Sequence, residues 1–456
     1  MFRREKAFSQ TFYPILVLIA CGLGAPRANA DGYVRFDASS FLLNSANQPN
    51  ATSTILLGPE MATEGKWISA VMDIKGVVFI SDANSFTVEA GNLYAATSPQ
   101  WMPHHQITLG RRIYDWNEME DQWGLGLWSA RFMWNPLNPE RIGMTGAFYS
   151  YESAKWRLIA FATPISPPER SFPISDTNGQ LSADSRDFAI PYQQLQLLNT
   201  TVPISYSILY PSLQTLLIRP GAALQARYGS PEGPWGSFSY GVMPMHQVQM
   251  AIEAPYDPIL NQVDATIHPM SFYHHLVTFE TGFHGKHWSV WGSATGEDPV
   301  QQAVPASWDI TPMGPAVMAA AGGEMRLDEF FTFSSSYLQV KEDAPPLAAT
   351  AVPLNLPSRF EYTQAYQMEG KWTGIPQVTA DVHWIYDIAN LSSLLSCDLI
   401  YQPTAKRSNL LRSLFGGYGA WTFGVGADFI TSASDAGYIG QFVGNDRVRG
   451  RISYAF

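Results

Sequence analysis

The sequence predicts an all-β protein whose strands close into a transmembrane antiparallel β-barrel of 18 strands, with 16 as the alternative count. Apolar and polar residues alternate with period two in many segments, which is typical of strands with one apolar and one polar face. The segments run for about ten residues, the length of a tilted strand that crosses a bilayer. A soluble antiparallel β protein, the competing interpretation, would use shorter strands of ~5–6 residues.

The third observation is that the chain lacks a sequence for a membrane-spanning helix after its first thirty residues. After residue 30 no apolar run approaches the ~18 residues of a membrane helix. The chain is rich in aromatic residues (13%) and poor in charged ones (15%). A closed barrel is the other structure that satisfies every backbone hydrogen bond in lipid, so the sequence favours a barrel.

The alternation is easiest to follow in the last hundred residues. One apolar set consists of Trp421, Phe423, Val425, Ala427 and Phe429. Another consists of Phe360, Tyr362, Tyr366 and Met368, which face away from Arg359, Glu361, Thr363, Gln367 and Glu369. We expect the apolar sets to meet lipid and the opposite sets to line the lumen.

Eighteen segments are expected as strands. They are 32–40, 66–74, 76–82, 85–97, 105–114, 142–152, 155–163, 220–229, 235–252, 270–283, 287–295, 316–327, 330–342, 357–370, 376–388, 391–402, 417–430 and 436–456. The count becomes 16 if 66–82 is one strand and 32–40 lies outside the wall. An odd count would put the termini on opposite sides, which single-chain bacterial barrels avoid.

Short and long connections mostly alternate along the chain, as in barrels with periplasmic turns and external loops. Tight turns are expected at 153–155, 285–286 and 328–329. Long connections are expected near 41–65, 115–141, 164–219, 296–315 and 343–356. The connection 164–219 contains seven Pro residues, is followed by Pro220, and shows little alternation. Either it folds inward and narrows the lumen, or it packs outside on its own aromatic residues.

The N-terminus predicts a secretory signal peptide over residues 1–30. Arg3, Arg4 and Lys6 precede an apolar stretch, and Ala28-Asn-Ala30 offers a cleavage site. The alternative is a lipobox that ends in Cys21. Removal of residues 1–30 takes away four cations and one anion, which leaves a formal charge of −14. This charge disfavours nucleic acid as a partner, and the lone remaining Cys397 excludes a disulfide framework.

Motifs for catalysis or metal binding are weak. There is no G-x-S-x-G elbow, so no catalytic residue is predicted. His104-His105 and His274-His275 are adjacent residues, which face opposite ways on a strand and cannot readily chelate together, so no metal or other cofactor is predicted. The acidic run Asp115, Glu118, Glu120 and Asp121 either binds divalent cations with lipopolysaccharide or forms a solvated loop face, and the second is favoured.

The last residues resemble the C-terminal signal of Gram-negative outer-membrane proteins. Phe456, Tyr454, Ile452 and Val448 supply the terminal aromatic residue and the alternate apolar positions, although Gly450 departs from the pattern. The resemblance implies recognition by the barrel-assembly machinery and location in the outer membrane. In size and plan the chain is similar to porin-type channels, which suggests a homotrimer as a candidate assembly. The stretch 107–112 is similar to Gly-Arg strands of alginate-export-like barrels, from which no site residue is carried over.

The polar strand faces supply the candidate pore-lining residues. Arg447, Arg449 and Arg451 form a cationic ladder on the last strand. The other candidates are Arg227, Arg359, Glu361, Asp381, His383 and Asp428. Opposed charges at a constriction select ions by local potential, whereas the competing interpretation is that they pair and brace the wall.

The sequence therefore predicts a non-enzymatic outer-membrane channel for the passive passage of small solutes. Its expected surroundings are outer-membrane lipid and lipopolysaccharide. Two alternatives stay open at this point: a plugged barrel that acts as a surface receptor, adhesin or scaffold, and an outer-membrane barrel enzyme.

Overall fold

The computed structural model describes the chain from Ala28 to Ala455 with several gaps. The described residues are 28–43, 50–80, 86–171, 174–183, 185–188, 191–197, 200–300, 302–310, 313–343, 359–403, 420–434 and 437–455. Residues 1–27 of the predicted signal peptide 1–30, with Cys21, and the terminal aromatic Phe456 lie outside them, whereas Ala28–Ala30 lie at the start of β1. The signal peptide, the alternative lipidation of Cys21 and the C-terminal assembly signal stay predictions.

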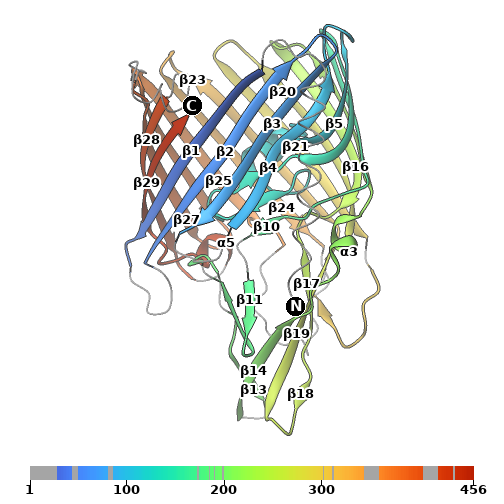
Figure 1. Ribbon diagram of the computed structural model, residues 1–456, viewed down its shortest axis with the longest axis vertical. Helices are drawn as coiled ribbons and strands as arrows, with labels where there is room; N and C mark the ends of the chain where they lie inside the picture. Colours follow the sequence, from blue (N-terminus) through green and yellow to red (C-terminus); the bar gives the residue numbers. More distant parts are fainter. Residues whose placement is uncertain are drawn as a thin grey trace.

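The predicted fold class is confirmed, because eighteen strands form one closed antiparallel barrel (Figure 1). The wall strands are β1 (Ala28–Phe41), β2 (Ala51–Glu64), β3 (Ile68–Phe79), β4 (Phe86–Thr97), β5 (His105–Arg112), β8 (Met144–Glu152), β9 (Trp156–Thr163), β15 (Gly221–Gly229), β16 (Gly233–Pro244), β20 (Tyr273–His284), β21 (Trp288–Val300), β23 (Ala316–Arg326), β24 (Phe331–Glu342), β25 (Gln364–Ile375), β26 (Val378–Asp387), β27 (Ser392–Tyr401), β28 (Ala420–Ser432) and β29 (Arg447–Ala455). Each strand pairs with its neighbours in this order, and β1 pairs with β29 from Tyr33↔Ala455 to Phe41↔Arg447. Closure leaves the sheet without a free edge.

The count of 18 is confirmed, but two assignments behind it were wrong. The segment 66–82 holds one strand, β3, and the expected connection 41–65 contains β2. The count of 16 was also wrong, because 32–40 lies in the wall strand β1. Gly58 and Pro59 obscure β2 in the sequence, because Pro donates no ladder hydrogen bond and both residues disfavour strands. The pairing with β3 pauses at these two residues and resumes in the same register.

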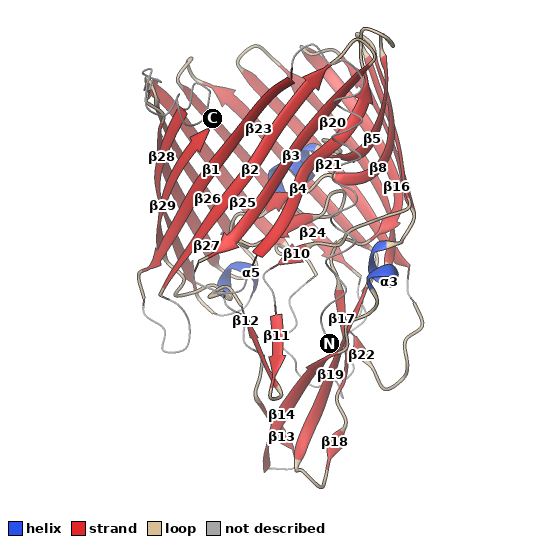
Figure 2. Cartoon of the chain, viewed as in Figure 1, coloured by secondary structure: helices blue, strands red, loops and turns tan. Residues whose placement is uncertain are grey.

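Most connections segregate by length between the two ends of the barrel; the exceptions are the short connection 388–391 at the end with long loops and the connection 402–419 at the end with tight turns. The tight turns expected at 153–155, 285–286 and 328–329 join wall strands at the end where the chain finishes (Figure 1). The connections 113–143, 164–220 and 245–272 emerge at the opposite end, which we call the loop end. Figure 2 shows that an additional group of strands projects beyond the barrel at the loop end.

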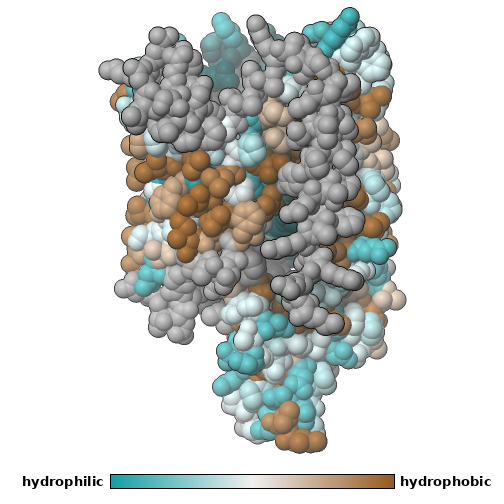
Figure 3. Space-filling model, in the orientation of Figure 1, coloured by the Kyte–Doolittle hydropathy of each residue, from teal (hydrophilic) through white to brown (hydrophobic). Residues whose placement is uncertain are grey.

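The outer face of the wall is apolar. Exposed outward side chains include Phe238, Phe279, Val290, Val317, Leu399, Val425 and Ile452. Figure 3 shows apolar residues gathered over the described wall at mid-height. Aromatic side chains border this band, with Trp156, Tyr228 and Trp288 near the turns and Tyr240 and Tyr273 toward the loop end. An apolar band between aromatic girdles is typical of a barrel that spans a bilayer.

A small lobe with its own core projects from the loop end, and it combines parts of 164–219 with parts of 245–272 and with Asp309–Ile310. Strands β13 (Gln194–Leu197), β14 (Thr200–Ile208), β19 (Gln262–Met270), β17 (Gln249–Glu253), β22 (Asp309–Ile310) and β18 (Tyr256–Asp257) form one sheet. The hairpin of β11 (Ile174–Thr177) and β12 (Gln180–Ala183) packs on that sheet. Leu181, Val202, Ile204 and Val263 are buried between the two layers.

The helices among the described residues are short: α2 (Glu118–Trp123), α3 (Leu213–Leu217) and α5 (Gly437–Gly440). Among the described residues, no helix has the length and hydropathy needed to span a bilayer.

Candidate solute pathway

Residues 113–143, which we call the inner segment, fold into the barrel. Gln225 on β15 donates a hydrogen bond to the carbonyl of Trp116 at 2.6 Å. Gln367 on β25 donates to the carbonyl of Gln122 at 3.1 Å. Arg447 on β29 donates to the inner segment at Asn135 Oδ1, 2.7 Å away. These strands lie far apart around the wall, so the inner segment crosses the lumen.

The acidic run shapes the inner segment, and its interpretation as a solvated loop face was wrong for Glu120, which is buried, whereas Asp115 is exposed. Asn117 caps α2 by accepting the backbone N–H of Glu120 at 2.6 Å. Gly124 ends the helix with a left-handed φ of 55°. The buried Glu120 carboxyl accepts the N–H groups of Gly126 and Leu127 at 2.9 and 3.1 Å. Burial raises the pKa of Glu120 to about 7, and these hydrogen bonds oppose the rise.

Tryptophans attach the inner segment to one side of the wall. The rings of Trp116 and Trp128 stack with centroids 5.0 Å apart, and both are fully buried. The Trp128 indole N–H donates to Thr278 Oγ1 at 3.2 Å. The ring lies so close to Gly241 that a Cβ there would meet Trp128 at 2.9 Å. The surrounding apolar core reaches the wall through Phe148, Phe161, Met243, Leu276, Met318, Leu338, Ile385, Leu394 and Ile430.

Arg131 joins several connections inside the barrel. It lies in β6 (Arg131–Met133). Its guanidinium donates to Glu169 and to Glu361, each at 2.6 Å, and to the carbonyl of Gly124 at 2.7 Å. The strand β6 also pairs with β10 (Arg170–Ser171). The connection 164–219 therefore combines the two placements that the sequence left open: its start lies in the barrel, and its middle forms part of the external lobe.

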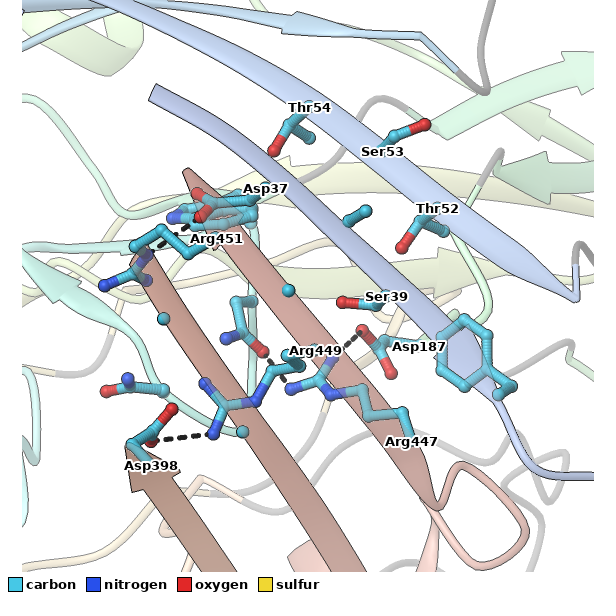
Figure 4. A pocket seen from close by; sticks show the side chains of 18 of the residues that line it. Asp37, Ser39, Thr52, Ser53, Thr54, Asp187, Asp398, Arg447, Arg449 and Arg451 are labelled. Atoms are coloured by element: carbon cyan, nitrogen blue, oxygen red, sulfur yellow. Dashed lines mark hydrogen bonds and ion pairs between the residues drawn. The ribbon is translucent and has the colours of Figure 1, made fainter. Parts of the chain in front are cut away.

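A cavity remains on the side of the barrel away from Trp116 and Trp128. It has a volume of about 130 Å³. Strands β1, β2, β27, β28 and β29 contribute its wall, and Trp134, Asn135 and Asn138 contribute the inner segment's side. Figure 4 shows Arg447, Arg449 and Arg451 along β29 with their side chains directed into this cavity.

Each of the three arginines is paired with carboxylates. Arg447 Nε lies 2.6 Å from Asp428 Oδ2. Arg449 bridges Asp398 at 2.9 Å and Asp428 at 3.0 Å. Arg451 Nε lies 2.8 Å from Asp37 Oδ1. The ladder is therefore a set of ion pairs between neighbouring strands, and Arg451, whose side chain is 40% exposed, is the most open of the three.

The charges continue from the ladder toward β3. Arg35 contacts Asp37 at 2.7 Å and Glu140 at 3.7 Å. Lys75 contacts Glu140 at 2.7 Å. Glu140 belongs to β7 (Glu140–Arg141) of the inner segment, so the charged network links both sides of the cavity.

Two of the remaining candidates do not lie on wall strands. β25 begins at Gln364, so Arg359 and Glu361 precede it, and their expected placement on the wall was wrong. Arg359 contacts Glu297 at 2.5 Å and Glu342 at 2.7 Å in a buried cluster. Phe360 and Tyr362 were expected to face lipid, but both are buried in the core inside the barrel. The alternation of apolar and polar residues cannot reveal where β25 begins, because the loop before it also contains apolar residues at alternate positions.

The other candidates lie on wall strands away from the cavity. The guanidinium of Arg227 on β15 lies 4.0 Å from the ring centroid of Trp235 and contacts His284 at 3.0 Å. His383 on β26 contacts Gln367 at 3.3 Å. Asp381 is two residues before it on the same strand. Of the nine candidates, the structure gathers four at the cavity: Arg447, Arg449 and Arg451 line it, and Asp428 pairs with Arg447 and Arg449.

Several cavity residues were not predicted from the sequence. They are Asp37, Asp187, Asp398, Glu140 and Arg186. Asp37 and Asp398 sit on the polar faces of their strands, a signal that the sequence contains. Glu140 and Asp187 lie in long connections. The signal for the inner segment was its four tryptophans at 116, 123, 128 and 134, which do not suit a solvated loop.

Comparison with known proteins gives only distant likenesses. No protein-family model matches the chain, and no curated protein matches it. Among solved structures, Acinetobacter baumannii OccAB4 superposes with a TM-score of 0.48 at 10% identity, over 95% of this chain and 98% of that one. Pseudomonas aeruginosa OpdQ gives 0.45 at 11%, over 94% and 98%. A BenF-like porin from Pseudomonas fluorescens Pf-5 gives 0.44 at 8%, over 95% and 98%. The barrel assignment accordingly rests on the strand register of this chain.

Proposed function

We propose that this chain is an outer-membrane channel through which small solutes pass passively along the arginine side of the lumen. The observation that carries the proposal is the charge-lined cavity between the inner segment and the wall formed by β27–β29, β1 and β2. A polar cavity beside a lipid-facing apolar wall is what a water-filled path through a barrel requires.

The balance of charge in the cavity sets the expected selectivity. Its cations are Arg186, Arg447, Arg449 and Arg451, and its anions are Asp37, Glu140, Asp187 and Asp398. Because equal numbers of opposite charges face the same space, we expect the ion selectivity to be modest. We propose that it favours anions, because Arg451 is the most exposed arginine of the ladder. A solute that carries one positive and one negative group would find charged partners for both in this cavity.

Planar-bilayer recording tests both points. The purified, folded protein should conduct ions, and the Arg449→Glu/Arg451→Glu variant should lower the relative permeability to anions. Arg326→Glu is the matched control, because Arg326 is 65% exposed at the turn end of β23, away from the cavity. An unchanged reversal potential in a salt gradient would refute the selectivity role, and no current at all would sink the channel proposal.

One observation favours a second candidate, a plugged barrel that serves as a surface receptor, adhesin or scaffold. The apolar core of the inner segment fills the lumen beside β8, β9, β15, β16 and β20, and a lobe projects from the loop end (Figure 2). The same recording separates the candidates, since a plugged barrel would fold and insert without conducting.

The other partner assignments stay predictions. They are contacts with lipopolysaccharide, recognition by the barrel-assembly machinery, assembly as a homotrimer, and the lack of nucleic-acid binding. We propose no enzymatic activity.

A further inference from the structure

The stretch that returns from the external lobe to the barrel is unusual for a solvated loop. Residues 188–218 contain no Asp, Glu, Lys or Arg. Within it, Leu209, Tyr210, Leu213 and Ile218 are 61%, 63%, 67% and 58% exposed. Isolated exposed apolar residues are ordinary. Four within ten positions, without a charged residue between them, indicate a surface that contacts a membrane or another molecule.

This stretch runs from the lobe to the loop-end rim of the wall. At the lobe, the backbone N–H of Leu209 donates to the carbonyl of Ile267 on β19 at 2.9 Å; at the rim, that of Ser166 donates to the carbonyl of Leu217 at 2.9 Å. Ser166 follows the wall strand β9, and α3 is followed by β15. Figure 2 shows α3 at the outer edge of the barrel, beside the end of β16.

The rim beneath α3 is the border of the lipid-facing band. Leu224 and Tyr240 pair with one another on the outer face of β15 and β16, and both are exposed. Ala222 and Val242 are the next outward pair toward the loop end. The apolar side chains of α3 and its flanks thus continue a surface that already faces acyl chains.

Arg219 lies at the end of this apolar surface. The Arg219 guanidinium lies 5.6 Å from the ring centroid of Tyr273 at the start of β20, and its Nε donates to the carbonyl of Thr215 at 3.0 Å. Tyr273 belongs to the aromatic border at the loop end. An arginine at that height sits at the level of lipid headgroups, whose phosphate a planar guanidinium can bind with two hydrogen bonds.

We infer that residues 209–219, which we call the rim anchor, dock into the outer leaflet of the membrane, with Leu209, Leu213 and Ile218 among acyl chains and Arg219 on a lipid phosphate. The inference rests on the outer-membrane location in the proposed function. It commits to lipid as the occupant, because the surface continues the lipid-facing wall and its charge is positive beside anionic headgroups. The phosphorylated lipid of that leaflet, lipid A, is the expected ligand.

Spin labels at three positions of similar exposure test the docking. Leu213→Cys reports on the rim anchor, Phe279→Cys on the mid-wall, and Leu260→Cys on the tip of the lobe; these residues are 67%, 59% and 61% exposed. Each is placed in a Cys21→Ser/Cys397→Ser background and reconstituted in phosphatidylcholine vesicles that contain lipid A. Collision rates with oxygen, which concentrates in lipid, and with a water-soluble nickel chelate place each label.

The expected result is that positions 213 and 279 collide more with oxygen and position 260 more with nickel. If the label at 279 collides more with oxygen while the label at 213, like that at 260, collides more with nickel, the rim anchor is overturned and the proposed channel is unaffected. If 279 itself reads water, the membrane-spanning barrel fails, and the proposed function falls with it.

The phosphate contact has a separate readout. Native mass spectrometry of detergent-solubilised protein measures retained lipid A, and Arg219→Gln should weaken retention about fivefold, the effect of losing one partly exposed charge contact. Arg326→Gln removes an exposed arginine at the opposite end of the barrel and should leave retention unchanged. Equal retention by the two variants would overturn the assignment of Arg219.

Discussion

Arg447 and Asp428 face each other across the last two strands of the barrel, with Nε and Oδ2 separated by 2.6 Å and both side chains buried. Asp428 also accepts from Ser396 at 2.8 Å and contacts Arg449 at 3.0 Å. One carboxylate therefore holds two rungs of the arginine ladder.

We predict that Asp428→Ala destabilises the barrel by about 3 kcal/mol, because the loss of one partner leaves a buried charge uncompensated. Asp398→Ala is the control, since Asp398 is 37% exposed and a partly solvated pair contributes ~1 kcal/mol or less. Urea unfolding in detergent micelles measures both changes. Equal losses for the two variants would contradict the assignment of Asp428 as the central carboxylate.

A methyl group at Gly241 should displace the inner segment. The added Cβ would meet the rigid ring of Trp128 at 2.9 Å, a separation that forces the indole to move. We expect Gly241→Ala to cost about 1–3 kcal/mol and to increase hydrogen exchange in residues 113–143. Gly292→Ala serves as the control, because a Cβ there meets nothing within 4 Å. If both variants exchange like wild type, the stack of Trp116 and Trp128 does not hold the segment.

The buried carboxyl of Glu120 predicts a pH dependence of stability. Its pKa is raised to about 7 by burial, whereas a glutamate of the unfolded chain titrates at ~4.3. The folded protein binds the Glu120 proton more tightly than the unfolded chain does. The contribution of Glu120 to the free energy of unfolding is therefore full below pH ~4 and is lost as the pH rises through about 7. The linked free energy is on the order of 3 kcal/mol.

Glu120→Gln should remove this part of the slope. The measurement is the urea midpoint at pH 5 and pH 8 for wild type, Glu120→Gln and the exposed-turn control Glu329→Gln. Wild type and the control should lose stability between these pH values by the same amount, and Glu120→Gln by clearly less. A slope shared by all three proteins would show that Glu120 does not titrate in this range.

The lobe should unfold independently of the wall. Ile204 is 5% exposed in the core between the hairpin and the sheet of the lobe. Ile204→Ala should cost about 2–5 kcal/mol locally, because that core is separate from the one inside the barrel. Hydrogen exchange should rise in 174–183 and 200–208 and stay unchanged in β23 to β27. Faster exchange in both regions would show that lobe and wall unfold as one unit.

The sequence predicted the wall well and the interior poorly. Period-two alternation identifies a strand such as β28, because one face meets lipid and the other does not. It carries no information about connections, so the inner segment was expected outside, although its tryptophans are core residues. The carboxylates that pair with the ladder depend on register: Asp428 lies opposite Arg447 only because of how β28 and β29 align. Asp187 reaches Arg447, 3.9 Å away, through a loop whose path no local pattern fixes.

The contact between Arg451 and Asp37 has a consequence for how the barrel is made. The two residues are 414 positions apart in the chain and lie on the last and first wall strands. Because these are the last and first strands of the wall, we expect this ion pair to form late, when the seam between β29 and β1 closes. The ion pairs of Arg447 and Arg449, in contrast, join consecutive strands from β27 to β29 and do not require closure. A barrel with an open seam would therefore leave Arg451 and Asp37 unpaired, and the charge along its pathway would differ from that of the finished protein.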